Sequence, residues 1–199
     1  MKLLMSPASP FVRKARVLIR EADLRDTVQE IEVTTHALAP DPTVVATNPT
    51  GKIPALVRTD GPAIYDSRVI TRYLDAHANA GLYPEKRIWD VLTIEATADA
   101  IMDAAVLITY EARLRPPDKQ FDGWTDGQWT KVIGGVSALN DRWMSQLSGP
   151  LDMGQISVGC ALGYLDLRHD ARGWRAKNTA LAAWYTAFSE RDSMTATAP

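Results

Sequence analysis

The spacing of apolar residues changes near residue 88, and this change limits the possible folds more than any other feature of the sequence. Before it, strand-like and helical segments alternate in the order β-α-β-β-β-α. After it, every long segment repeats its apolar residues at helical spacing. A β-α-β start favours two parallel strands, and a following hairpin adds an antiparallel edge. The sequence therefore predicts an α/β domain followed by an all-α domain.

The α/β domain is expected to cover residues 1–78. Its predicted elements are strands at 2–5 and 28–33, a hairpin of strands 55–58 and 63–65 turning at Asp60-Gly61, and helices starting near Phe11 and Val69. The basic stretch RKAR (13–16) is interpreted as the solvent-facing side of the first helix. Residues 79–87 are expected to form a linker.

The all-α domain is expected to cover residues 88–199. Four helices are predicted, at 88–113, at 126–146, around an apolar face of Ile156, Cys160, Gly163 and Leu167, and around a stripe of Leu181, Trp184, Tyr185 and Phe188. Before the third helix, Asp152 is predicted to cap the helix while the Gln155 side chain reaches back in a reciprocal box. The final SMTATAP has no such spacing and is expected to be a loose tail.

Composition excludes several classes of function. The chain has 46% hydrophobic and 23% charged residues and a net charge of −2, which gives no reason to expect nucleic acid or an anionic membrane as partner. No signal peptide or membrane-spanning run is visible. The single Cys160 excludes an internal disulfide and fits a reducing compartment. The scattered His36, His77 and His169 suggest no metal site. We expect a soluble cytoplasmic protein.

The stretch NPTGKIPALV (48–57) raises a more specific question. Two prolines and a glycine exclude a helix, yet IPALV is typical of the start of a buried strand. A proline at the mouth of a strand indicates either a rigid corner or a corner whose exposed backbone groups bind a ligand.

Four stretches of the chain together resemble the cytosolic glutathione transferase family: SPASPFVRKARV (6–17), NPTGKIPALV, YDSRVITRYL (65–74) and LDMGQISVGCALGYLD (151–166). The serine near the first helix start is similar to that of bacterial, serine-type members. The resemblance implies a thioredoxin-like N-terminal domain that binds glutathione and a C-terminal helical bundle that binds the electrophile. It also implies a homodimer, with glutathione as cosubstrate and no permanently bound cofactor.

The resemblance implies two groups that hold the glutathione tripeptide. A cis bond between Ile53 and Pro54 would turn the N–H and C=O of Ile53 outward, where they pair with the cysteinyl part as a neighbouring strand would. Asp66 and Ser67 stand where a helix N-cap belongs, and the first-turn N–H groups with the Ser67 hydroxyl would receive the γ-glutamyl carboxylate. Many relatives carry Glu in place of Asp66.

Two serines are candidates for steadying the glutathione thiolate. Ser9 precedes Pro10, which an N-cap followed by proline at the first helical position explains by itself. The family, however, places a Ser, Cys or Tyr at this helix start, facing the sulfur. The resemblance thus implies Ser9 as the catalytic residue, with Ser6 as the alternative, and Phe11 beside it among the glutathione-binding residues.

The energy required is within reach of a hydroxyl at a helix start. Lowering a thiol pKa from ~8.5 to ~6.5 needs about 2.7 kcal/mol, and one hydrogen bond to a charged group supplies about 1.5–3 kcal/mol. The SPFV stretch has no sulfur, and Cys160 is expected to be a buried core thiol, which argues against thiol-transferase chemistry.

Tyr110 and Arg113, near the end of the first long helix, are candidates for the electrophile site, although a cation at a helix end is also explained by the helix dipole. The predicted function is attack of the glutathione thiolate on a hydrophobic electrophile. Two alternatives stay open: a non-catalytic glutathione-binding or regulatory protein of the same fold, as in stringent-starvation-type proteins, or a specialised glutathione-dependent isomerase, dehalogenase or peroxidase.

Overall fold

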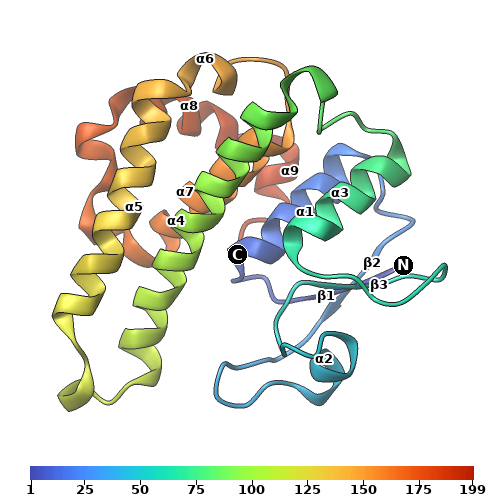
Figure 1. The fold of residues 1–199 in the computed structure, drawn as a ribbon, viewed down its shortest axis with the longest axis horizontal. Coiled ribbons are helices and arrows are strands. Elements are labelled where there is room, and N and C mark those ends of the chain that lie inside the picture. Colours follow the sequence, from blue (N-terminus) through green and yellow to red (C-terminus); the bar gives the residue numbers. More distant parts are fainter. The chain divides into compact units, whose positions relative to one another are not determined.

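The computed structural model describes residues 1–199, which fold into two compact units (Figure 1). One unit comprises Met1–Pro84 together with Arg191–Pro199, and the other comprises Glu85–Glu190. The first unit contains β1 (Lys2–Met5), α1 (Pro10–Glu21), β2 (Gln29–Glu32), α2 (Pro42–Thr47), β3 (Ala55–Val57), α3 (Ser67–Ala78) and α9 (Asp192–Thr195). The second contains α4 (Ile88–Leu114), α5 (Asp122–Arg142), α6 (Met144–Leu147), α7 (Met153–His169) and α8 (Thr179–Ser189).

The sheet of the first unit has the order β2-β1-β3. β1 pairs in parallel with β2 and antiparallel with β3, so that Leu4 is aligned with Ile31 on one side and with Ala55 on the other. The predicted α/β class, the parallel pair and the antiparallel edge are confirmed. The second hairpin strand is reduced to one bridge between Leu56 and Ile64. Pro62 lacks the N–H that a longer ladder would need.

Helices cover both faces of this sheet, with α1 and α3 side by side on one face and α2 on the other (Figure 1). Leu4 and Ala55 pack with Val44 of α2. Their neighbours Leu3 and Leu56 point to the opposite face, because side chains alternate along a strand, and both are fully buried. Helix α2 was not predicted.

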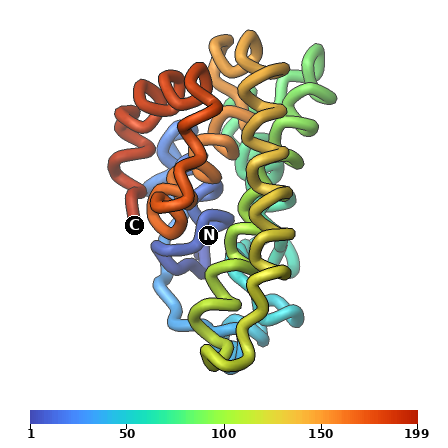
Figure 2. Tube along the Cα trace, turned by 90° about the vertical axis from the view of Figure 1, so that its left-hand side faces the viewer, coloured from blue at the N-terminus to red at the C-terminus, as the bar shows by residue number.

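The second unit is all-helical, as predicted, and is built around α7. Helix α4 packs against both α7 and α5, and α4 and α5 run side by side along their lengths (Figure 2). Residues 152–165 are all buried. The predicted apolar face is confirmed for Ile156, Cys160 and Gly163 but is wrong for Leu167, which is 41% exposed, and burial extends all round the helix up to residue 165. The helix predicted at 126–146 starts earlier and ends at Arg142.

The cap of α7 forms only half of the predicted reciprocal box. The Asp152 carboxylate accepts the Gln155 N–H at 3.2 Å. The Gln155 side chain instead donates to the carbonyls of Gln146, Gly149 and Pro150. Burial raises the pKa of Asp152, more than the Gln155 N–H and the Arg87 guanidinium, 3.3 Å away, lower it.

The end of the chain departs most from the prediction. Residues 191–199, assigned from sequence to the helical domain and partly to a loose tail, belong to the first unit and include α9. Met194 and Thr197 are fully buried. The interpretation of RKAR as a solvent-facing stretch is also wrong, because Arg13 and Arg16 are buried. No helix is long and apolar enough to span a membrane, and no His, Cys, Asp and Glu side chains gather as a metal site would require.

Candidate functional site

Three segments of the first unit meet at the carboxyl end of β1. α1, with Ser9 at its start, follows β1 directly. β3 runs antiparallel to β1, so the Ile53–Pro54 corner that precedes it lies at the same end. The bridge of Ile64 to Leu56 is antiparallel, so the chain then runs back towards this end and enters α3 at Ser67. The topology thus gathers most of the candidate residues at one edge.

Ser9 is the N-cap of α1. Its Oγ accepts the Val12 N–H at 3.3 Å, and its own N–H donates to the Ser6 carbonyl at 3.1 Å. A hydroxyl that accepts one hydrogen bond still has its proton to donate. Ser9 is half-buried, as is Phe11 in the first turn. Ser6 is half-buried as well, in the turn that leads into the helix.

The expected cis peptide bond between Ile53 and Pro54 is present. The Ile53 side chain packs against the cluster of Leu4, Val44 and Ala55, which anchors the corner to the core. Neither the N–H nor the C=O of Ile53 has a hydrogen-bond partner within the protein. These two backbone groups can therefore pair with a peptide-like ligand in the manner of an added strand.

Asn48 shapes this corner, and the sequence analysis missed it. Its side-chain amide donates to the Lys52 carbonyl at 2.8 Å, and its Oδ1 accepts the N–H and hydroxyl of Thr50 at 3.0 and 2.9 Å. Its carbonyl accepts the N–H of Gly51, whose φ of +67° favours glycine. Asn48 is 2% exposed. The Asn-Pro pair and the following glycine were the available signal.

At the start of α3, Asp66 caps the helix and Ser67 does not. The Asp66 carboxylate accepts the Arg68 N–H at 3.0 Å and pairs with the Arg68 guanidinium at 3.0 Å. The Ser67 hydroxyl, in a residue that is 3% exposed, makes no hydrogen bond within the protein. The Tyr65–Asp66 peptide bond is also cis. Because Asp66 caps the helix, the serine hydroxyl is left for another partner.

The charge of Asp66 follows from its surroundings. Burial raises the pKa of this carboxyl, but the side chain of Arg68 and the N–H groups of Arg68 and Val69 outweigh that effect and lower the pKa overall. Asp66 is therefore ionised at neutral pH, and its carboxylate suits a cationic group of a ligand better than an anionic one.

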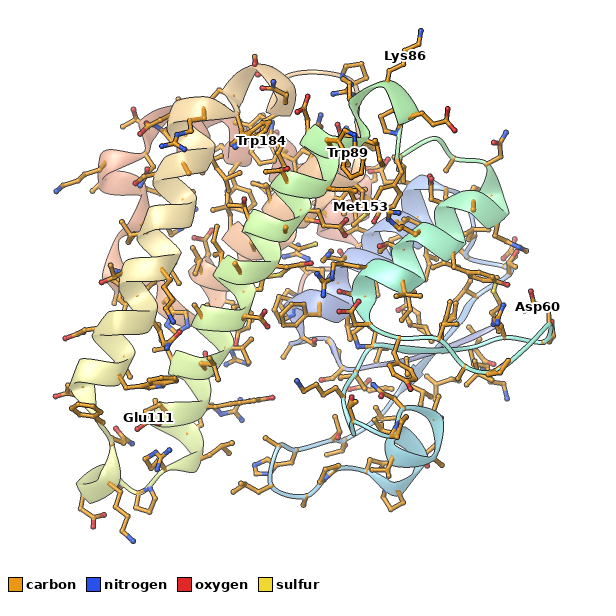
Figure 3. All side chains as sticks on the ribbon, viewed as in Figure 1. Asp60, Lys86, Trp89, Glu111, Met153 and Trp184 are labelled. Atoms are coloured by element: carbon orange, nitrogen blue, oxygen red, sulfur yellow. The ribbon has the colours of Figure 1, made fainter.

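Tyr110 and Arg113 lie elsewhere, near the end of α4 in the second unit, where Figure 3 labels their neighbour Glu111. Tyr110 is 42% exposed. The structure adds Tyr164 of α7, which sequence analysis missed and whose hydroxyl donates to Thr109 at 3.1 Å. Burial raises the pKa of Tyr164, against the opposing effects of Thr109, Arg168 and Arg113. In the sequence, Tyr164 could not be distinguished from the apolar core residues around it.

The fold and this arrangement define a class of protein. Residues 8–77 match the family model for the glutathione S-transferase N-terminal domain, and residues 122–187 match that for the C-terminal domain. The chain therefore belongs to the glutathione S-transferase family, and its fold is the thioredoxin-like plus helical fold of that family.

Individual relatives match along nearly their whole length. A glutathione transferase family member from Pseudomonas fluorescens Pf-5, solved with bound glutathione, is 43% identical over 100% of this chain and 98% of its own, with a TM-score of 0.97. A second Pseudomonas fluorescens Pf-5 structure, with bound S-(propanoic acid)-glutathione, is 42% identical over 100% and 99%, with a TM-score of 0.92. An uncharacterized GST-like protein, YibF, from Escherichia coli K12 is 29% identical over 100% and 98%.

Proposed function

We propose that the protein is a serine-type glutathione transferase that joins the glutathione thiolate to a hydrophobic electrophile. The observation that carries this proposal is the meeting of free polar groups from three residues at the carboxyl end of β1. These are the hydroxyl proton of Ser9, the backbone N–H and C=O of Ile53, and the hydroxyl of Ser67. Glutathione bound to the Pseudomonas relative, at 43% identity over the whole chain, supports the same ligand here.

Each part of glutathione has a partner of matching chemistry. The cysteinyl N–H and C=O pair with Ile53, beside Pro54, as in an added strand. The γ-glutamyl carboxylate accepts from the Ser67 hydroxyl and the first-turn N–H groups of α3, where the helix dipole favours an anion. The ionised Asp66 then suits the neighbouring ammonium group. Phe11 borders the sulfur end of the ligand.

Catalysis in this proposal rests on the thiolate and on positioning. Ser9 donates its hydroxyl proton as a hydrogen bond to the sulfur, and the N-terminus of α1 adds its positive potential. The thiolate electron pair forms the new C–S bond at the electrophilic carbon, and the electrons of the broken bond go to the leaving group. In an addition, they go to the carbon that is then protonated by solvent. No step requires a metal or a bound cofactor.

The electrophile is proposed to contact Tyr110 and Arg113 of α4. The nearby Tyr164 and Arg168 add a phenol and a second cation to this group. S-(propanoic acid)-glutathione, bound to a Pseudomonas relative, supports electrophiles such as α,β-unsaturated acids as the first compounds to test.

A homodimer is proposed as the working form. The face of α4 that bears Trp89, which is 78% exposed (Figure 3), borders a groove of about 510 Å³ on α4 and α5 that includes Leu92, Ala96 and Lys131. Sedimentation should give a dimer mass for the wild type and a monomer for Trp89→Glu. Phe121→Glu, at another exposed aromatic residue, should remain dimeric. A wild-type monomer at all concentrations would remove the dimer from the proposal.

We infer a bacterial, cytoplasmic setting, in keeping with the bacterial relatives and with a lone, buried Cys160 in a chain that uses glutathione. A role in detoxification would follow from broad use of electrophiles. The alternatives are a glutathione-binding regulator without turnover and a specialised isomerase, dehalogenase or peroxidase, and the glutathione contacts would serve these equally well.

The decisive experiment is a calorimetric titration with glutathione, combined with the ultraviolet absorbance of the bound thiolate across pH. A transferase should bind glutathione and lower the pKa of its thiol. Ser9→Ala should still bind glutathione, but the pKa of the bound thiol should return towards the value of free glutathione. Ser6→Ala tests the alternative serine: it should change neither the binding nor the pKa of the thiol, and a raised pKa in this variant alone would assign the role to Ser6. Binding with an unshifted thiol favours the regulator, and no binding at millimolar glutathione rejects the site.

A further inference from the structure

The segment 191–199, here called the C-terminal strap, is bound to α1. The Arg13 guanidinium donates to the Met194 carbonyl at 2.9 Å and to the Thr197 hydroxyl at 3.4 Å. The Arg16 guanidinium donates to the Thr197 carbonyl at 3.5 Å. Because Met194 and Thr197 are fully buried, the strap is packed as part of the core of the first unit.

Carboxylates hold the strap and the remaining arginines in place. Glu21, at the end of α1, accepts from Arg191 at 2.9 and 3.0 Å and from the Ser193 hydroxyl. Burial raises the pKa of Glu21, but Arg191 and Ser193 outweigh it and lower the pKa overall. Glu30 of β2 pairs with Arg16 at 2.8 Å and also with Arg20 at 2.6 Å, so Arg16 has an ionic partner, which it shares with Arg20.

Arg13 differs from these arginines because it is buried without a carboxylate. Arg13 is 7% exposed, and its side-chain hydrogen bonds go to the neutral oxygens of Met194 and Thr197. A buried charge without an ionic partner is costly, so it is retained only where its surroundings or a ligand compensate for it.

The position of Arg13 relates this charge to the candidate site. Its backbone N–H donates to the Ser9 carbonyl at 3.0 Å, in the first turn of α1. Four residues along a helix correspond to a rise of about 6 Å, and side chains lean towards the helix N-terminus. The positive charge therefore lies near the first turn of α1, the turn that Ser9 caps.

We propose that Arg13 is a positioning residue whose buried positive charge, held in place by the C-terminal strap, favours the thiolate form of glutathione bound at Ser9. This inference rests on the proposed function. The charge adds to the positive potential of the helix N-terminus without touching the ligand, and Arg13 forms no ion pair that would cancel it. The strap at residues 191–199 thereby supports a site at Ser9, far from it in the sequence.

The test compares three variants by the pKa of the thiol in saturating glutathione, read from thiolate absorbance. Arg13→Met should raise this pKa by about 0.5–1 unit, the size expected for removing one charge at roughly 10 Å in a partly screened environment. Arg13→Lys, which restores the charge, should return it to within about 0.3 unit of the wild type. Arg16→Met is the matched control. It loosens the same strap, but Arg16 is paired with Glu30 and lies almost one helical turn farther from Ser9, so the pKa of the thiol should rise clearly less than in Arg13→Met.

An unchanged thiol pKa in Arg13→Met overturns the inference. So does an equal rise of the thiol pKa in Arg16→Met, because the strap would then act by general packing alone. Should Arg13→Met fail to fold, Arg13→Gln gives the same comparison while keeping a donor for Met194. The wild-type arm separates the two proposals: an unshifted thiol there rejects the proposed function itself, whereas a lowered pKa that all variants retain rejects only the role of Arg13.

Discussion

Replacing Asn48 with alanine tests whether the corner at Ile53 is organised before glutathione binds. The substitution removes the bonds from Asn48 to the Lys52 carbonyl and to the N–H and hydroxyl of Thr50. Lys52 immediately precedes Ile53, so these bonds fix the chain at the point where the proposed ligand contact begins.

The size of the effect follows from these bonds. Each intramolecular hydrogen bond is worth about 0.5–1.5 kcal/mol net, and three of them at a site that is 2% exposed should lower the free energy of unfolding by about 2–3 kcal/mol. If the disordered corner must be ordered again on binding at a cost of about 1.4 kcal/mol, the glutathione Kd should rise about tenfold.

Urea unfolding and calorimetric titration of the same preparation give both quantities. Thr50→Val is the control, since it removes only one of these bonds, the partly buried one from the Thr50 hydroxyl to Asn48. It should change the free energy of unfolding by less than about 1 kcal/mol and Kd by less than about twofold. A stability loss in Asn48→Ala with an unchanged Kd would show that the corner does not need preorganisation, and the reasoning would be wrong.

Three further outcomes are expected. Ser67→Ala should weaken glutathione binding at least tenfold by calorimetry with the same melting temperature, because its hydroxyl makes no internal bond and donates to a charged group of the ligand. Since the folded pKa values of Glu21 and Glu30 are lowered, their contribution is present above the unfolded value of about 4.3 and is lost as pH falls through the folded values. Urea unfolding between neutral and acid pH should show this loss, with a shallower fall in Glu30→Gln. Asp166→Ala, which leaves the buried Trp174 N–H without its acceptor at 2.8 Å, should cost about 1–3 kcal/mol in thermal unfolding, and Asp166→Asn clearly less.

Local patterns were sufficient for much of the first unit. β1 and the cap at Ser9 could be read from a short apolar run and a Ser-Pro pair, because strand alternation and capping act over a few residues. The cis bond at Pro54 came from the resemblance to a family and not from periodicity. Helix α2 was overlooked although Asp41-Pro42 is a sound helix start, since the segment that follows is too short to show a period.

Contacts between distant residues escaped the sequence analysis. The burial of Arg13 depends on a segment at the other end of the chain, and nothing in the spacing of RKAR indicates that partner. The Gln155 side chain satisfies three loop carbonyls rather than its own cap, which only the path of the preceding loop decides. The role of Asn48 likewise depends on a loop conformation that composition does not encode.

The return of the chain to the first unit has a consequence for its synthesis. The ribosome makes Met1–Pro84 first, but the groups to which Arg13 and Arg16 donate in Arg191–Pro199 follow only after Glu85–Glu190. At about 5–20 residues per second the intervening translation takes on the order of 10 s. Throughout that time the nascent α1 lacks the strap that buries its basic face, so the first unit is completed only after the second has been made. A fragment ending at Pro84 would keep that face open to water.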